Sequence, residues 1–274
     1  MSGADYVPPP MPLPDPNFEP AIRDPKKLRN TALVLVVMML LGGWFVLKAY
    51  NQWAAQKAPD DRPAVIYRIT PERDLRMLRQ DGKIVDVVDL RGKVVAIHVM
   101  SLRDPQAAAL SLGVMKRLAE SRAGEKDFAL ISLVVDPLPS EKLLPSLKEL
   151  SAANGMSLPQ WWVGGNEPKT LHKFIKNELK ANVYPNEADG KWLYDAAIVL
   201  IDKGGHVRRA VVPQKQGGPP FIATFDFEQA AAWDAKGAKT RPPGAGIERS
   251  NLGELEFLLN RTINKLLAEP SELR

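Results

Sequence analysis

The longest apolar segment of the chain covers residues 31–47, TALVLVVMMLLGGWFVL, and contains no charged side chain. As a helix this segment would be about 25 Å long, close to the hydrocarbon thickness of a bilayer of about 30 Å. The pattern predicts a transmembrane helix over residues 31–50, and the lipid bilayer is thus the first expected partner. Aromatic side chains suited to the membrane interface lie at its end, namely Trp44, Tyr50 and Trp53.

The flanks of this segment predict how it would be oriented. Residues 1–30 are rich in proline at their start, which is typical of a disordered tail. Four basic residues precede the span (Arg23, Lys26, Lys27 and Arg29), whereas Lys48 and Lys57 follow it. The positive-inside rule then places the N-terminus in the cytoplasm. We expect a single-pass inner membrane protein with a linker at 51–63 and a domain at 64–274 in the periplasm or intermembrane space.

Two apolar runs predict the centre of that domain. Residues 94–100 and 128–135 are apolar on both strand faces, which favours central strands covered on both sides. Residues 195–202 and 206–212, on either side of the Gly204-Gly205 turn, predict a hairpin. A second hairpin is predicted around the Asp81-Gly82 turn, and residues 161–163 read as a short edge strand or docked loop.

Helical spacing of leucine and other apolar residues predicts four helices in the domain, at 105–118, 145–154, 167–179 and 252–267. Pro145 suits a first turn and Gly155 a C-terminal stop. Asn251 and Glu254 are spaced like a capping box. The order of elements predicts an α/β fold of the thioredoxin-like sandwich type, with a central mixed sheet flanked by helices.

Residues 213–249 are rich in proline and glycine and predict an irregular insertion. A loop of this length is usually functional or disordered, and the sequence favours neither. It nevertheless carries aromatic residues that could anchor a partner protein. The candidate partner contacts in and outside this insertion are Trp161, Trp162, Phe221, Phe225, Phe227 and Trp233.

Composition argues against several classes of function. The net charge of +5 comes from 37 Lys and Arg against 32 Asp and Glu, without a basic run, so nucleic-acid binding is not expected. The absence of cysteine excludes disulfides, thiolate nucleophiles and iron–sulfur clusters. No Gly-rich phosphate loop, HExxH or GxSxG motif is found. We expect no enzyme activity, no cofactor and no small-molecule substrate.

Three stretches resemble the Sco/SenC family of membrane-anchored copper chaperones for cytochrome c oxidase. They are DLRGKVV at 89–95, ISLVVDP at 131–137 and IVLID at 198–202. The resemblance covers about residues 64–212 and the last helix. It implies copper binding through a cysteine pair and a histidine, and those positions fall on Asp104, Ala108 and Tyr194. The resemblance therefore implies a degenerate member without its copper ligands.

The sequence also offers other ligands and other roles for these residues. His98 and Met100 share a strand face and could form a rebuilt copper site, although a lone histidine in an apolar strand is more often a packed core residue. His172 and His206 have no spaced partner and are expected to be solvated. Asp104 could cap a helix that begins at Pro105.

The leading hypothesis is an accessory, structural or assembly subunit of a respiratory or other energy-transducing membrane complex. The first alternative is a copper metallochaperone with non-cysteine ligands. A thiol-independent peroxidase or reductase is a more distant one.

Overall fold

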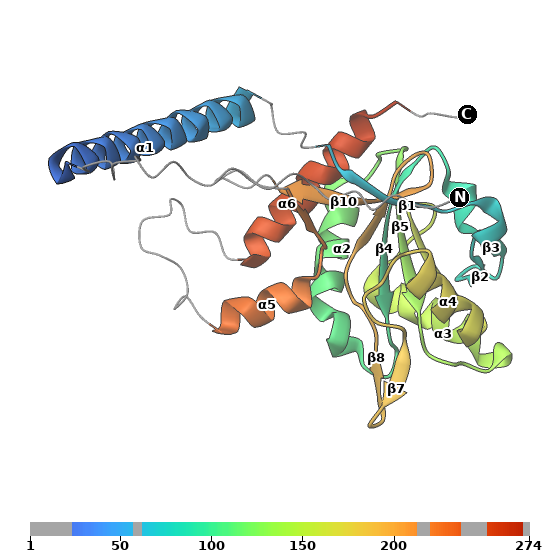
Figure 1. The fold of residues 1–274 in the computed structure, drawn as a ribbon. Helices are drawn as coiled ribbons and strands as arrows, with labels where there is room; N and C mark the ends of the chain where they lie inside the picture. Colours follow the sequence, from blue (N-terminus) through green and yellow to red (C-terminus); the bar gives the residue numbers. More distant parts are fainter. Residues whose placement is uncertain (1–23, 57–61, 213–219, 237–250, 271–274) are drawn as a thin grey trace, which may run out of the picture. The chain divides into compact units, whose positions relative to one another are not determined.

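A computed structural model describes residues 24–56, 62–212, 220–236 and 251–270 (Figure 1). The chain divides into two compact units, Met1–Ala58 and Pro59–Arg274. The described part of the first unit is one helix, and the second unit is an α/β domain. The predicted tail at residues 1–23 lies outside the described residues.

Helix α1 (Pro25–Gln56) begins earlier and ends later than the predicted span of 31–50. The Asp24 carboxylate accepts a hydrogen bond from the Lys26 amide at 2.9 Å, and Pro25 occupies the first helical position, so the helix has a defined start. Within its stretch Pro25–Tyr50 a window of 18 residues has a mean hydropathy of 2.2, and the stretch is long and apolar enough to cross a membrane.

The predicted interface residues lie at the end of this stretch, and Trp44 and Tyr50 are both exposed. The side chain of Trp53 lies outside the described residues. Residues 51–56, expected as linker, continue the helix because Ala and Gln favour it and the next proline is Pro59.

The domain is organised around a nine-stranded sheet in the order β1-β10-β9-β4-β5-β6-β2-β3, with β11 paired to β10 (Figure 1). A separate two-stranded sheet pairs β7 with β8. The strands are β1 (Ala64–Arg68), β2 (Arg76–Arg79), β3 (Ile84–Asp86), β4 (Val94–Met100), β5 (Phe128–Val134), β6 (Trp161–Gly165), β7 (Asn186–Ala188), β8 (Lys191–Leu193), β9 (Val199–Ile201), β10 (His206–Val212) and β11 (Phe221–Ala223).

Four neighbouring strands form the thioredoxin-like core of this sheet. β4 and β5 are parallel and in register from Val94 opposite Phe128 to Met100 opposite Val134. β9 runs antiparallel to β4, and β10 runs antiparallel to β9. The β-α-β unit followed by a hairpin and a final helix confirms the predicted mixed sheet.

The sequence prediction was wrong about β6. β6 lies between β5 and β2 rather than at an edge.

The helices of the domain are α2 (Ala109–Ser121), α3 (Ser140–Asn154), α4 (Pro168–Asn177), α5 (Phe227–Lys236) and α6 (Asn251–Ala268), with 3-10 turns at η1 (Pro71–Arg73), η2 (Val87–Leu90) and η3 (Pro105–Ala108). α3 starts five residues before Pro145, which lies inside the helix and not in its first turn. Pro145 removes one backbone donor near the helix start, and the helix tolerates it. Gly155 adopts the expected left-handed conformation at the end of α3, with φ of 69°.

The sheet separates two apolar clusters. The first includes Met100, Leu130 and Trp161 and is covered by side chains of α2, α3 and α6. The second includes Ile97, Ile131 and Trp162 and is covered by side chains of α4. Trp161 and Trp162 point to opposite faces because adjacent strand residues alternate. Both are buried, with 2% and 6% exposed, so the expectation that they form an exposed partner contact is wrong.

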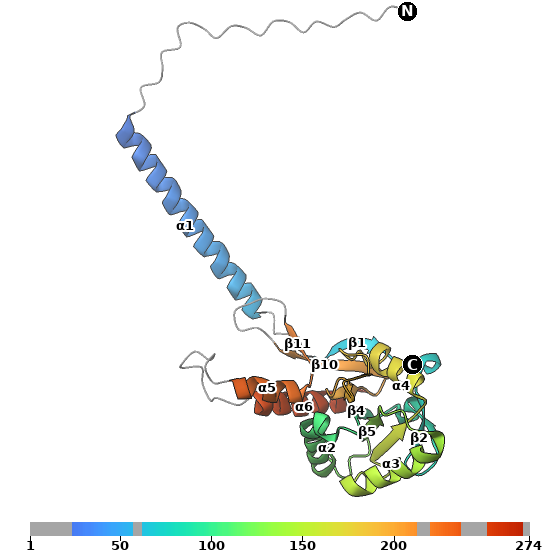
Figure 2. The same cartoon turned by 90° about the horizontal axis from the view of Figure 1, so that it is seen from below.

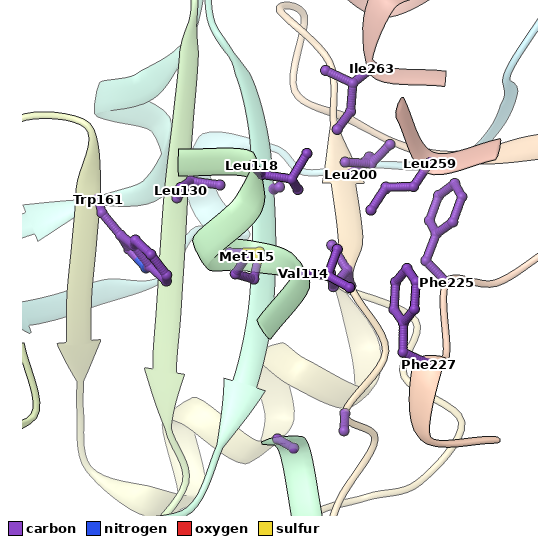
Figure 3. Packing of buried hydrophobic residues seen from close by; sticks show 14 of the residues in the cluster. Val114, Met115, Leu118, Leu130, Trp161, Leu200, Phe225, Phe227, Leu259 and Ile263 are labelled. Atoms are coloured by element: carbon purple, nitrogen blue, oxygen red, sulfur yellow. The ribbon is translucent and has the colours of Figure 1, made fainter. Parts of the chain in front are cut away.

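The insertion predicted at 213–249 is partly regular. Its described residues form β11 and α5, while 213–219 and 237–249 lie outside the described part. Figure 3 shows Phe225 and Phe227 beside one another and next to Leu259 of α6. Each is 1% exposed, so these two rings belong to the core and cannot serve as partner contacts. Phe221 and Trp233 are 60% and 55% exposed, as expected of candidate contacts.

Candidate functional site

The loop that follows β4 is held by one buried carboxylate. Asp136, just after β5, accepts hydrogen bonds from the Ser101 hydroxyl at 2.9 Å and from the Leu102 amide at 2.6 Å. The Arg103 amide lies 3.3 Å from the same carboxylate, and the Arg103 guanidinium lies 3.9 Å from it. The Asp136 side chain has no exposed surface. Its oxygens are thus engaged by the loop that they stabilise.

Asp104 does not cap a helix. Its side chain makes no capping hydrogen bond, and the residues from Pro105 form a 3-10 turn rather than the start of α2. The α-helix begins only at Ala109. The prediction that Asp104 caps a helix from Pro105 is therefore wrong, because the regular helix starts one turn later.

The N-terminus of α2 is capped by a residue that is distant in sequence. The Glu228 carboxylate of α5 accepts from the Leu110 amide at 3.1 Å, from the Ser111 amide at 3.0 Å and from the Ser111 hydroxyl at 2.6 Å. A carboxylate at this position pairs with free backbone N–H groups and with the positive end of the helix dipole. The helix end that follows the first core strand is thus occupied by the chain itself.

α5 caps a second helix in the same way. The Asp234 carboxylate accepts from the Asn251 amide at 2.9 Å, from the Asn251 side-chain nitrogen at 2.8 Å and from the Leu252 amide at 3.1 Å. Asn251 is therefore a donor at the start of α6 and not the acceptor that the capping-box prediction required. α5 lies beside α2 and α6 (Figure 2). One acidic residue near each end of α5 caps one of these two helices.

Tyr194 lies near the carboxylates of Asp104, Glu228 and Asp136. Its ring packs against both apolar clusters, and its hydroxyl is buried without a hydrogen-bond partner among the described residues. Burial raises the pKa of Tyr194, an interaction with the Ser101 backbone opposes this rise less strongly, and the negative charges of Asp104, Glu228 and Asp136 raise the pKa further. The phenol is thus kept protonated.

The three positions implied by the family resemblance do not suit copper. Asp104 and Tyr194 are close enough to interact electrostatically, so the fold brings these two positions together. Ala108 is buried and has no donor atom in its side chain. Copper(I) prefers thiolate, thioether and imidazole ligands, whereas this set offers a carboxylate and a protonated phenol. Within the described ranges no group of three or more His, Asp or Glu side chains could hold a metal ion.

His98 forms a buried polar pair in the first cluster. Its Nδ1 lies 3.1 Å from the Ser132 hydroxyl, which accepts a hydrogen bond from the Trp161 indole at 2.8 Å. His98 Nε2 has no partner in the described structure. Burial lowers the pKa of His98 to about 4. Met100 lies two residues further on the same strand face and is also buried.

Both other histidines were expected to be solvated, but only His206 is partly exposed. His172 is buried, with Nε2 2.9 Å from the Val135 carbonyl oxygen, and its ring contacts those of Tyr184 and Trp192. His206 Nδ1 lies 3.1 Å from the Asp202 carboxylate. Sequence spacing missed both interactions, since the partner of His172 lies on another element and that of His206 lies across a hairpin turn.

Comparisons with known proteins find distant structural matches. No family model and no curated protein matches the chain. A SCO1/SenC family lipoprotein from Bacillus anthracis is similar at 22% identity and a TM-score of 0.45, over 54% of this chain and 84% of that one. Copper-bound ScoI of Bradyrhizobium japonicum is similar at 20% identity and a TM-score of 0.41, over 62% and 98%. Copper-bound ScoI of Arabidopsis thaliana is similar at 11% identity and a TM-score of 0.42, over 72% of this chain and 98% of that one.

The strand order and register, rather than these scores, carry the fold assignment. The solved structures that the chain resembles include Sco/SenC proteins, as the three sequence stretches imply. By its strand order and register the chain is a thioredoxin-like protein; it is similar to solved structures of the Sco/SenC family and contains no cysteine.

Proposed function

We propose that this chain is a membrane-anchored accessory, structural or assembly subunit of a respiratory or other energy-transducing membrane complex. α1 would be the anchor, with the N-terminus in the cytoplasm and the thioredoxin-like domain in the periplasm or intermembrane space. The domain would act through its surface, without redox or copper chemistry. The respiratory part of this proposal rests on the sequence resemblance to Sco/SenC proteins.

One observation carries the non-catalytic part of the proposal. The helix end after the first core strand, where a lowered thiol pKa is typical of thioredoxin-like proteins, is occupied by the Glu228 carboxylate. The nearby Asp136 carboxylate is likewise engaged by backbone and hydroxyl donors. Groups that could act on a substrate are thus used to hold the fold, which supports a role in binding rather than in catalysis.

Trp233 of α5 is the best-placed candidate for a partner contact. Its side chain is 55% exposed on a helix whose other face is fixed by Glu228 and Asp234. An aromatic side chain on a rigid element loses little entropy on binding. Truncation of such an anchor typically costs about 2 kcal/mol, which is about thirtyfold in Kd.

Affinity purification from native membranes tests this proposal. We expect the tagged full chain to bring down subunits of one membrane complex, and Trp233→Ala to reduce their recovery by about an order of magnitude. Ile84→Ala serves as the matched control, because Ile84 is also exposed, at 70%, but lies on the edge strand β3. A chain that purifies alone, as a monomer, would contradict the proposed function.

The unpartnered Nε2 of His98 is the observation that favours copper binding as a second candidate function. Titration of the full chain in detergent with Cu(I) and Cu(II), against a competing chelator, separates the two proposals. We expect no stoichiometric sub-micromolar site. Binding that is lost in His98→Ala and in Met100→Leu, but kept in His206→Ala, would favour the metallochaperone instead.

A further inference from the structure

One edge strand of the domain exposes apolar side chains on both of its faces. Phe221 and Ile222 of β11 are 60% and 44% exposed, although adjacent residues of a strand point in opposite directions. β11 pairs with the end of β10, where Val211 and Val212 are only half-buried. We call Phe221 and Ile222, together with this end of β10, the β11 corner.

Strand register places the β11 corner next to the start of the domain. Ala64, the first residue of β1, lies opposite Arg209 of β10. The next residue of β10, Ala210, lies opposite Ala223 of β11. Ala64 and Ala223 are thus on neighbouring rungs of the sheet, within about 12 Å at a strand spacing of about 4.8 Å.

The covalent tether limits how far this part of the domain can lie from α1. Gln56, the last residue of α1, and Ala64 are at most about 29 Å apart, because the chain between them extends by at most about 3.6 Å per residue. The candidate span ends at Tyr50, and the remaining turns of α1 add about 9 Å. The opposite sheet edge, β3, lies seven strand spacings from β1, which is about 34 Å across the sheet. The β11 corner is therefore among the parts of the domain with the shortest tether.

A short tether makes a weak apolar contact effective. Partial burial of one aromatic and one aliphatic side chain is worth about 3 to 4 kcal/mol, which corresponds to a dissociation constant in the millimolar range. A short covalent connection supplies an effective concentration of about the same size. The same two side chains on an untethered protein would leave it in solution.

We propose that the β11 corner rests on the surface of the bilayer that α1 enters, with Phe221 and Ile222 in the interfacial layer. This inference rests on the part of the proposed function that makes α1 a membrane anchor. It adds a second membrane contact that fixes which face of the domain is turned toward the lipid. The edge of β11 is then covered by lipid headgroups.

The lack of cysteine makes the test simple, because a single introduced cysteine is the only thiol. The full chain carrying Phe221→Cys is labelled with a bimane fluorophore and reconstituted in phosphatidylcholine vesicles. We expect strong quenching by doxyl-labelled lipid and at least about threefold weaker quenching by aqueous iodide than for Ile84→Cys. Ile84 is the matched control because it is exposed and apolar but lies at the far sheet edge. Ile222→Cys repeats the measurement if Phe221→Cys does not fold.

A third label separates this inference from the anchor itself. Val37→Cys, in the middle of α1, reports whether the helix enters the bilayer. Suppose that lipid quenches the label of Val37→Cys, but iodide quenches the label of Phe221→Cys as strongly as that of Ile84→Cys. This result would overturn the β11 contact and leave the anchor standing. No lipid quenching at 37 overturns the anchor and the inference together. Shielding of 221 from both quenchers indicates a protein contact and also overturns the inference.

Discussion

Replacing Glu228 with alanine should lower the free energy of unfolding by about 2 to 3 kcal/mol. The variant removes a carboxylate that accepts three hydrogen bonds at the start of α2, two of them from backbone amides. A capping residue is worth about 1 kcal/mol, and hydrogen bonds to a charged group about 1.5 to 3 kcal/mol. Urea unfolding of the full chain in detergent, followed by the fluorescence of buried tryptophans, measures the difference.

Two further variants show whether the carboxylate acts as a cap. Glu228→Gln keeps an acceptor for the amides and loses only the charge, so we expect a loss of about 1 kcal/mol. Glu120→Ala removes an exposed glutamate of α2 itself and should change stability by less than about 0.5 kcal/mol. Equal losses for Glu228→Ala and Glu120→Ala would mean that the cap contributes nothing measurable.

The effect is expected to be large because Glu228 links two parts of the chain. The helix that it caps follows the first core strand, while α5 belongs to the segment after the hairpin. Phe225 and Phe227 fix the start of α5 in the core, so Glu228 meets α2 at little entropic cost. The apparent insertion is therefore a structural part of the domain.

The core of the fold was predictable because its signals are local and strong. β4 and β5 are apolar on both faces, and only strands covered on both sides have this pattern. Gly155 marked the end of α3 because the left-handed conformation favours glycine. The Asp81-Gly82 turn likewise predicted the β2–β3 hairpin. Each of these features depends on residues that are neighbours in sequence.

The site was predicted only in part because its interactions are long-range. The sequence placed Asp104 and Tyr194 together through the family resemblance, and the structure brings them close. Nothing near Ala109 indicates that its helix is capped by Glu228, more than a hundred residues later. The same reason hides the capping of α6 by Asp234. Aromatic residues in a Pro/Gly-rich segment look exposed in sequence, yet Phe225 and Phe227 are held by α6.

The stability of the domain should also depend on His98 between about pH 7 and pH 4. Burial lowers the pKa of His98 from 6.5 to about 4. The unfolded chain therefore binds a proton in this range that the folded chain does not bind, so stability falls as the pH decreases. At about 1.4 kcal/mol per pH unit, the loss that is due to His98 reaches about 3 kcal/mol near pH 4 and stays constant below it.

Comparison with His98→Gln isolates this contribution. Glutamine does not titrate but can still hydrogen-bond Ser132, so the variant keeps the polar pair and loses the proton site. Acidic residues contribute equally to both pH profiles. The unfolding free energy of the unchanged protein minus that of the variant should therefore fall by about 3 kcal/mol from pH 7 to pH 4. A difference that does not change with pH would show that His98 is solvated in the folded protein. Solvation of His98 would also make its Nε2 accessible, and a copper site at His98 and Met100 requires an accessible Nε2.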